Sequence, residues 1–241
     1  ALSEEDKRKT AYHEAGHAIL NVLLDHTDPL HKVTIIPRGP SLGSTMFLPE
    51  KDKFSYHRKE MLAQLVVLMG GRVAEEIVLD DVASGASGDI SMATNLARRM
   101  VCEWGMSKDL GMVEYGGGDG EVFLARDINK SQNYSEATAQ KIDDEIKGFI
   151  DDAYAKATEI LQANRENLDL IADALMEFET LDAEQVTDIM ETGEMKNPPT
   201  PPSNRIIPGN QSDSGVSKSS APASEPGDET PPSGEAVGAP A

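Results

Sequence analysis

The sequence predicts a mainly helical domain with a small β component, followed by a disordered tail. Apolar residues recur at helical spacing over most of residues 1–196, whereas two short segments near the first helix are rich in β-branched residues. Residues 197–241 carry most of the fourteen prolines, many serines and glycines, and no aromatic residue. Such a composition cannot bury enough apolar surface to form a core. We therefore expect one folded domain over residues 1–196 and a disordered Pro/Ser/Gly-rich tail over residues 197–241.

The composition limits the possible partners and the compartment. A net charge of −20 argues against nucleic acid as a partner. The single cysteine, Cys102, excludes an internal disulfide and fits a reducing compartment. No apolar run in the sequence is long enough to cross a membrane, and we expect no signal peptide within it. The phosphate-binding motif Gly-x-x-x-x-Gly-Lys-Ser/Thr is also missing, so we do not expect this chain to be an ATPase.

The first elements are a helix and two strands. A helix is predicted from about Glu4 to Asp25, with Ser3 as its N-cap and Asp6 three residues later. The β-branched segment 31–37 and the segment 43–48 follow, separated by prolines and glycines. They are expected to form a small hairpin or sheet edge beside the helix.

The rest of the domain is predicted to be helical, apart from one pair of short strands. Gly70-Gly71 is expected to interrupt a helix that Ser55 caps, and Asp89 is expected to open another. The predicted helices span residues 55–69, 72–79, 90–104, 135–163, 164–178 and 183–191. The strands are expected at residues 112–115 and 121–124, on either side of a glycine-rich loop.

The first helix carries the sequence His13-Glu14-Ala15-Gly16-His17. Residues i and i+4 lie on one face of a helix, so His13 and His17 can present two ring nitrogens to one metal ion. Glu14, one step round the helix, can reach a water molecule there but is poorly placed as a third ligand. A zinc hydrolase needs this combination of imidazoles, a carboxylate base and an open position. The alternative is a pair of surface histidines with an incidental glutamate.

A catalytic zinc site needs a third protein ligand, for which the residues leave two candidates. His26 lies half a turn away from His17 around the helix, and His31 and His57 have no helical relation to the motif. All three are expected on the surface. Glu75 lies on an apolar helix where a carboxylate needs a partner, and Asp89 stands at a helix start after a glycine-rich loop. Asp89 can also be a simple N-cap, and the residues alone do not separate these possibilities.

Several segments together resemble the protease domain of the FtsH family, whose members are membrane-anchored, ATP-dependent zinc metalloproteases. The segments are His13-Glu14-Ala15-Gly16-His17, Gly70-Gly71-Arg72-Val73-Ala74-Glu75-Glu76, Ser84-Gly85-Ala86-Ser87-Gly88-Asp89-Ile90, residues 93–101 and Trp104-Gly105-Met106-Ser107. The resemblance covers about residues 2–195. It implies that Asp89 is the third zinc ligand and that Glu75 accepts the second ring N–H of a ligand histidine.

The resemblance also implies an assembly and a location. The family domain is mainly helical and assembles into a six-fold ring, so a homo-hexamer is expected. An ATPase module and transmembrane segments should precede the domain, and ATP and the membrane would act only through them. The expected location is the cytoplasmic face of a bacterial inner membrane, or its organelle equivalent, with this piece itself soluble. The expected substrates are unfolded or misassembled membrane and soluble proteins.

The residues suggest how such a domain would cut a peptide. With Zn²⁺ held by His13, His17 and Asp89, Glu14 is expected to act as general base for water attacking the peptide bond. The strand at 43–48, in particular Gly43, Ser44, Thr45 and Met46, is our candidate for the edge that pairs with an extended substrate. The alternative function is a non-catalytic ring-assembly module with a structural metal site. Glu14 argues against it, because closed structural sites use four protein ligands and no base.

Overall fold

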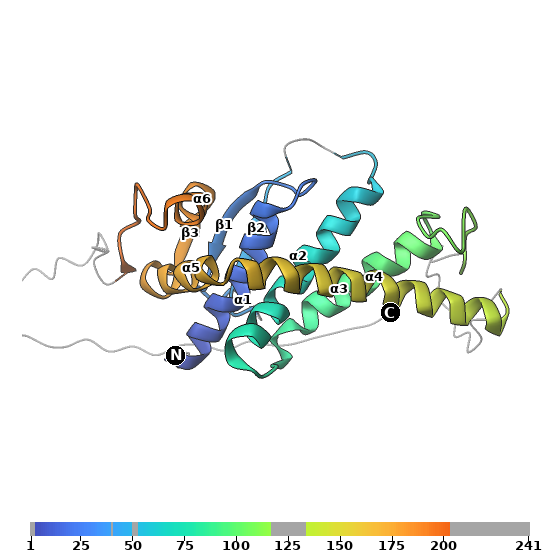
Figure 1. The fold of residues 1–241 in the computed structure, drawn as a ribbon, viewed down its shortest axis with the longest axis horizontal. Coiled ribbons are helices and arrows are strands. Elements are labelled where there is room, and N and C mark those ends of the chain that lie inside the picture. Colours follow the sequence, from blue (N-terminus) through green and yellow to red (C-terminus); the bar gives the residue numbers. More distant parts are fainter. Residues whose placement is uncertain (1–2, 40, 50–52, 117–133, 203–241) are drawn as a thin grey trace, which may run out of the picture. The chain divides into compact units, whose positions relative to one another are not determined.

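The computed structural model describes residues 3–39, 41–49, 53–116 and 134–202, and Figure 1 shows their arrangement. The elements are α1 (Glu4–Leu23), β1 (Leu30–Thr34), β2 (Ser44–Phe47), α2 (Arg58–Leu79), a 3-10 turn (Ser84–Ala86), α3 (Ser87–Cys102), α4 (Glu136–Ala163), α5 (Arg165–Phe178), β3 (Thr180–Asp182) and α6 (Ala183–Thr192). The predicted fold class, mainly helical with a small β component, is confirmed. Most of the predicted tail lies outside the described residues.

Helix α1 is fixed at its start by local hydrogen bonds and along its length by packing. The Ser3 hydroxyl accepts a hydrogen bond from the backbone N–H of Asp6 at 3.0 Å, as an N-cap should. Tyr12 is almost fully buried and donates from its hydroxyl to Asp169 of α5 at 2.8 Å. Because Tyr12 immediately precedes His13, this bond ties the motif to a second helix. The helix ends at Leu23, two residues earlier than predicted.

Helix α2 is continuous through Gly70-Gly71, so the predicted interruption there is wrong. Tertiary packing explains the difference. A Cβ atom added to Gly70 would lie 2.8 Å from the carbonyl oxygen of Gly16 on α1, and one added to Gly16 would lie 2.3 Å from the carbonyl oxygen of Gly70. The two glycines let the backbones of α1 and α2 touch, and this contact outweighs the low helix propensity of glycine. The helix begins after His57 rather than after Ser55.

The small sheet has the strand order β2-β1-β3, with both pairs antiparallel. The predicted hairpin corresponds to β1 and β2, in which Val33 pairs with Thr45 and Thr34 with Ser44. The third strand, β3, was not predicted. It pairs with the other side of β1, where Val33 faces Leu181. Within the described residues β2 is therefore an edge strand, and the sheet packs on α1.

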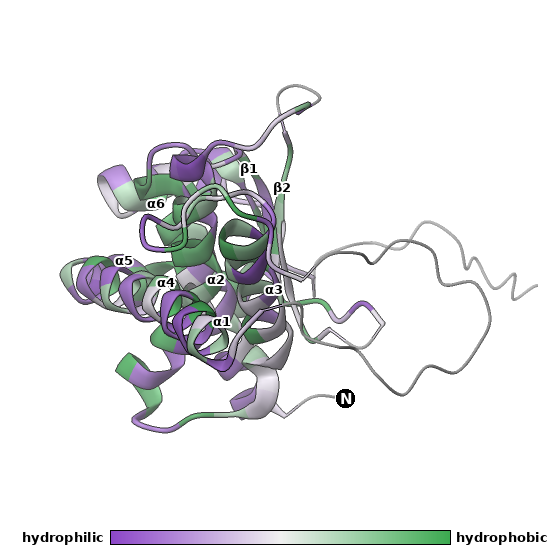
Figure 2. Cartoon of the chain, turned by 90° about the vertical axis from the view of Figure 1, so that its right-hand side faces the viewer, coloured by the Kyte–Doolittle hydropathy of each residue, from purple (hydrophilic) through white to green (hydrophobic). Residues whose placement is uncertain are grey.

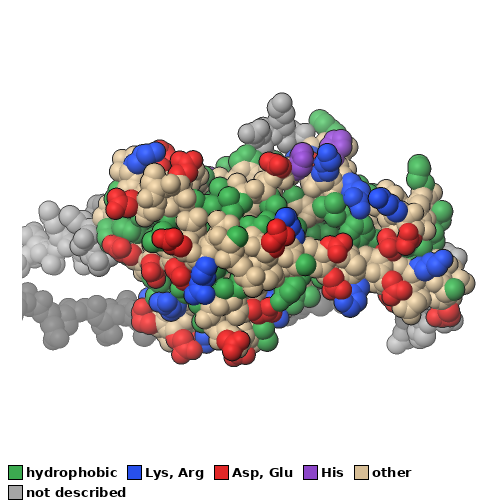
Figure 3. All heavy atoms as spheres, in the orientation of Figure 1, with side chains coloured by type: hydrophobic (Ala, Val, Ile, Leu, Met, Phe, Trp, Pro, Cys, Tyr) green, Lys and Arg blue, Asp and Glu red, His purple; other side chains and the backbone are tan. Residues whose placement is uncertain are grey.

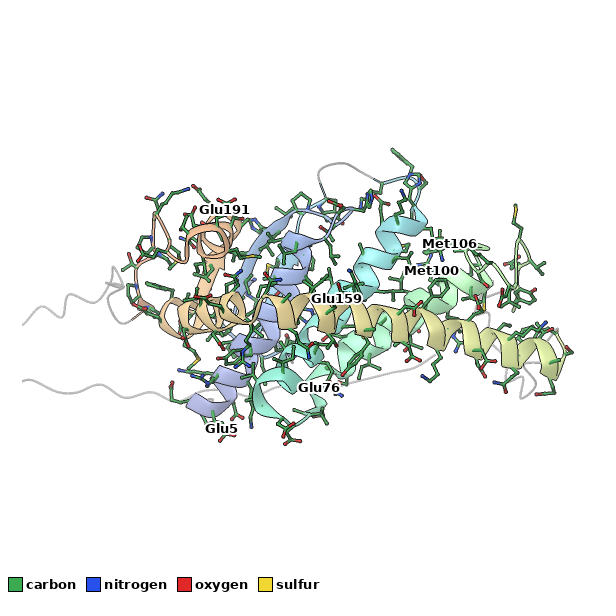
Figure 4. All side chains as sticks on the ribbon, in the orientation of Figure 1. Glu5, Glu76, Met100, Met106, Glu159 and Glu191 are labelled. Carbon is green, nitrogen blue, oxygen red and sulfur yellow. The ribbon has the colours of Figure 1, made fainter. Side chains whose placement is uncertain are left out.

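One core joins the helices, with α2 in contact with α1, α3 and α4 (Figure 2). Met100 of α3, labelled in Figure 4, is fully buried in this core. Two predicted N-caps are confirmed: Ser135 accepts from the N–H of Thr138, and Asp182 forms a capping box with Gln185. Residues 112–115 do not form the predicted strand, and the predicted strand at 121–124 lies outside the described residues.

Acidic side chains are spread over the surface rather than gathered on one element. Figure 3 shows them scattered over the visible face, and Figure 4 labels Glu5 on α1, Glu159 on α4 and Glu191 on α6, all of which are exposed. The boundary region after α6 stays close to the domain, because Gln185 donates to the carbonyl of Asn197 at 3.0 Å. Of the helices in the described ranges, none combines the length and the apolar character that crossing a membrane requires.

Candidate metal centre

Three side chains from two helices meet at one point. Nε2 of His13 lies 3.1 Å from Nε2 of His17, and Oδ2 of Asp89 lies 3.2 Å and 3.4 Å from these two nitrogens. Two atoms bound to a tetrahedral zinc ion at about 2.1 Å are roughly 3.4 Å apart, so the three separations suit a common ion. Within the described residues these side chains also form a group able to hold a metal ion. The helical spacing of α1 brings the two histidines together. The packing of α3 against α2 brings Asp89 to the same point.

The far nitrogens of both imidazoles are held by hydrogen bonds. Nδ1 of His17 lies 2.7 Å from the carbonyl oxygen of Val67, which can only accept, so this nitrogen carries the proton. Nδ1 of His13 lies 2.6 Å from Oε1 of Glu75, a carboxylate that is only 4% exposed. In the neutral rings both Nε2 atoms then present lone pairs toward Asp89. Three acceptors facing one another fit a cation between them.

The electrostatics of the cluster also favour positive charge. Burial lowers the pKa of His13, but hydrogen bonds to Asp89 and Glu75 outweigh it and raise this pKa to about 9. Burial likewise opposes the charged form of Asp89, yet hydrogen bonds from His13 and His17 hold its pKa well below the ordinary range. Both shifts arise from the contact of imidazoles with carboxylates, and they favour positive charge between these side chains, as a divalent metal would supply it.

Gly71 provides the space for the His13 ring. A Cβ atom added at this position would lie 2.3 to 2.6 Å from three atoms of the imidazole. No side chain can therefore occupy position 71 while His13 keeps its orientation toward Glu75 and Asp89. The two glycines therefore have different effects on the site. Gly70 allows α1 and α2 to come into contact, and Gly71 leaves room for the ring of His13. By propensity alone the same two glycines predict a helix break.

Glu14 lies beside the cluster and against strand β2. It is 6% exposed, and its Oε2 atom lies 2.6 Å from the hydroxyl of Thr45. A Cβ atom added to Gly43 would lie 2.8 Å from both Cγ and Oε1 of Glu14. The strand predicted as a substrate edge therefore also contacts the predicted base. These contacts cannot be predicted from the sequence, because only the fold brings this strand against α1.

The remaining candidates lie apart from the cluster. His26, His31 and His57 are exposed, as predicted, and His57 is the N-cap of α2. Asp89 is the third residue of α3, whose N-cap is Ala86, so it does not play the alternative part of an N-cap. Glu75 is in contact with His13 and not with the converging atoms of the cluster.

A cavity of about 150 Å³ is lined by residues of the helices and the strand that carry the site. Asn21 lies one turn after His17 on α1, Met92 one turn after Asp89 on α3, and Phe47 follows Thr45 on β2. Val67, whose carbonyl holds His17, also lines it. The lining combines apolar side chains, such as Phe47, Met92 and Leu68, with the ion pair of Lys53 and Asp28.

Comparison with known proteins places this geometry in a family. The model for peptidase family M41 matches residues 1–189. A protein of Methylacidiphilum infernorum named "ATP-dependent zinc metalloprotease FtsH 2" is 56% identical over 214 residues, which are 89% of this chain and 33% of that protein. One of Akkermansia muciniphila named "ATP-dependent zinc metalloprotease FtsH" is 59% identical over 206 residues, 84% of this chain and 25% of that protein.

These matches confirm the resemblance to the FtsH family. The chain spans a quarter to a third of the length of these two relatives, so it corresponds to one part of such proteins. The matched region contains α1, α2 and α3, which carry every residue of the cluster. The relatives are named zinc metalloproteases, in agreement with the predicted zinc and the predicted enzyme class. The chain belongs to peptidase family M41.

Proposed function

We propose that this chain is a zinc endopeptidase domain in which His13, His17 and Asp89 bind the metal and Glu14 is the general base. The observation that carries the proposal is the convergence of the two Nε2 atoms and Oδ2 of Asp89, with Glu14 on the same helix as the histidines. Glu75 orients the ring of His13 by accepting a hydrogen bond from its Nδ1–H group.

Each residue has a definite task in this proposal. Zinc in such a site lowers the pKa of water towards 7 and polarises a carbonyl group. Glu14 takes a proton from the water that attacks the peptide carbon, and then gives a proton to the leaving amine. His17 keeps its Nδ1 proton on the carbonyl of Val67, so that Nε2 remains free to bind. The burial of Glu14 limits competing water around the base.

Metal removal tests the proposal. Dialysis of the chain against a chelator should reduce cleavage of an unstructured casein-like protein by at least about a hundredfold, and stoichiometric Zn²⁺ should restore it. Added ATP should leave the rate unchanged, since the sequence has no phosphate-binding loop. Cleavage that survives complete loss of zinc would contradict the proposal.

We further propose that extended substrates pair with residues 43–46, which are Gly43 and the first three residues of β2. The support is the position of β2 at the edge of the described sheet and its contact with Glu14. Unfolded proteins are then the natural substrates, because their chains can adopt an extended form. The names of the relatives suggest that the domain works within a longer, ATP-dependent protease. We also propose that the longer protein assembles into a homo-hexameric ring and is anchored to a membrane by segments outside this chain.

We propose that this cavity, whose wall includes residues of α1, α2, α3 and β2, receives a substrate side chain next to the scissile bond. Its volume, about 150 Å³, suits a benzene-sized group, and its walls include Phe47 and Met92. Peptides with Phe next to the cleaved bond should therefore be cut about ten times faster than those with Ala, measured as kcat/KM.

A pair of variants tests the same prediction. Met92→Trp places a larger ring at the wall of the cavity, where Met92 is 55% exposed, and should reduce the preference for Phe over Ala. Met112→Trp is the matched control, because Met112 is 96% exposed and does not line the cavity. An unchanged preference in Met92→Trp would show that this cavity does not receive the side chain.

A further inference from the structure

The carboxylate of Glu14 is held by one residue of strand β2. The hydroxyl oxygen of Thr45 lies 2.6 Å from Oε2 of Glu14 and 3.2 Å from the backbone carbonyl oxygen of the same residue. Within the described ranges, no other side chain forms a hydrogen bond with this carboxylate. The orientation of the predicted base therefore depends on a contact between α1 and β2.

The shorter of the two contacts identifies the donor and the acceptor. A threonine hydroxyl has one hydrogen, and an ionised carboxylate can only accept. A separation of 2.6 Å is typical of an O–H donor bound to a charged oxygen, whereas 3.2 Å is long for a hydroxyl donor. Thr45 therefore donates to Oε2 of Glu14. The other oxygen, Oε1, remains without a hydrogen-bond partner among the described residues.

Gly43 bounds the same carboxylate from a neighbouring position. Gly43 immediately precedes β2, and side chains two residues apart in an extended chain lie on one face. A Cβ atom at position 43 would come within 2.8 Å of Oε1 of Glu14. Gly43 leaves the space that the carboxylate occupies, and Thr45 anchors the oxygen on its other side. Gly43 and Thr45 together therefore define the space in which the Glu14 carboxylate lies.

We propose that Thr45 is a positioning residue, whose hydroxyl sets the orientation of the Glu14 carboxylate for proton transfer. This inference rests on the proposed function, in which Glu14 is the general base. The same strand is the proposed substrate edge, so one element fixes both the peptide and the base that acts on it. Loss of the hydroxyl should lower kcat more than it raises KM, because the bond acts on the base and not on the peptide backbone.

Three variants of the zinc-loaded chain separate orientation from folding. Thr45→Val keeps the β-branched shape and removes the hydroxyl, while Thr45→Ser keeps the hydroxyl. On a quenched unstructured peptide, Thr45→Val should lower kcat by about ten- to a hundredfold with KM within about twofold, a part of what a positioned base contributes. Thr45→Ser should stay within about threefold of wild type. Both should bind zinc as wild type does, and Glu14→Gln serves as the reference for loss of the base.

A second measurement does not depend on activity. In the metal-free chain labelled with ¹³C-glutamate, the side-chain carboxyl signal of Glu14 is assigned by its disappearance in Glu14→Gln. It should move in Thr45→Val and remain near its wild-type position in Thr45→Ser. The inference is overturned if Thr45→Val leaves both kcat and this signal unchanged, if Thr45→Ser is as slow as Thr45→Val, or if only KM rises. If Glu14→Gln itself cleaves normally, the proposed function fails, whatever the Thr45 variants do.

Discussion

Replacing Glu14 by Gln should nearly abolish peptide cleavage while zinc stays bound. Gln has almost the same shape as Glu and can still accept the hydrogen bond from Thr45, but it cannot take a proton from water. A positioned general base contributes about 10²- to 10⁴-fold, so kcat should fall by that amount. The measurement is kcat on an unstructured peptide, together with zinc per chain by elemental analysis.

The controls for this prediction address folding. The melting temperature of Glu14→Gln should match that of wild type, because the side chain keeps its volume and its contact with Thr45. A lower zinc content would mean that the substitution disturbed the metal site rather than the base. Wild-type cleavage by a zinc-loaded Glu14→Gln chain would show that Glu14 is not the base, and would restore the alternative of a structural metal.

The second large effect concerns the two acidic residues that the sequence left unresolved. Asp89→Ala should lose zinc almost completely, because only two protein ligands remain. Glu75→Ala should keep zinc with about 10- to 100-fold weaker affinity, because it removes only the hydrogen bond that orients His13. The measurement is zinc affinity by competition with a chromophoric chelator.

Glu76→Ala is the matched control for that comparison. Glu76 follows Glu75 on α2, but its carboxylate contacts the hydroxyl of Tyr154 instead of the cluster. Its zinc affinity should equal that of wild type. If Glu75→Ala loses zinc more completely than Asp89→Ala, the roles of the two acidic residues are reversed and the ligand assignment is wrong.

Three of the helix starts were predictable from sequence because capping is local, whereas α2 and α3 begin at other residues than predicted. Ser3, Ser135 and Asp182 each bond to a backbone N–H three residues ahead, so the signal and the structure lie in the same short segment. The spacing of His13 and His17 is equally local. These features follow from one helix geometry and need no knowledge of the fold.

Features that depend on packing between distant segments could not be predicted in this way. Gly70-Gly71 favours a helix break by propensity, and only the contact with Gly16 and the ring of His13 explains why the helix continues. Strand β3 has three residues and exists because β1 offers an edge to it. The group that accepts the hydrogen bond from His17 is the backbone carbonyl of Val67. Every residue has such a carbonyl, so the sequence cannot indicate which one is used.

The third ligand shows the limit most clearly. Asp89 and Glu75 both lie on helices other than α1, and spacing along the chain does not tell which carboxylate reaches the two Nε2 atoms. The resemblance to the FtsH family indicated Asp89. The fold brings Oδ2 of Asp89 to the cluster and Oε1 of Glu75 to the opposite nitrogen of His13, so the two carboxylates have different partners.

The most direct test of the metal site is a crystal structure of the zinc-loaded chain with data collected on both sides of the zinc absorption edge. We expect one anomalous peak per chain, about 2.0 to 2.2 Å from Nε2 of His13, Nε2 of His17 and a carboxylate oxygen of Asp89, with Glu75 still on Nδ1 of His13. A peak bound by Glu75 in place of Asp89, or one away from the two histidines, would contradict the proposed site.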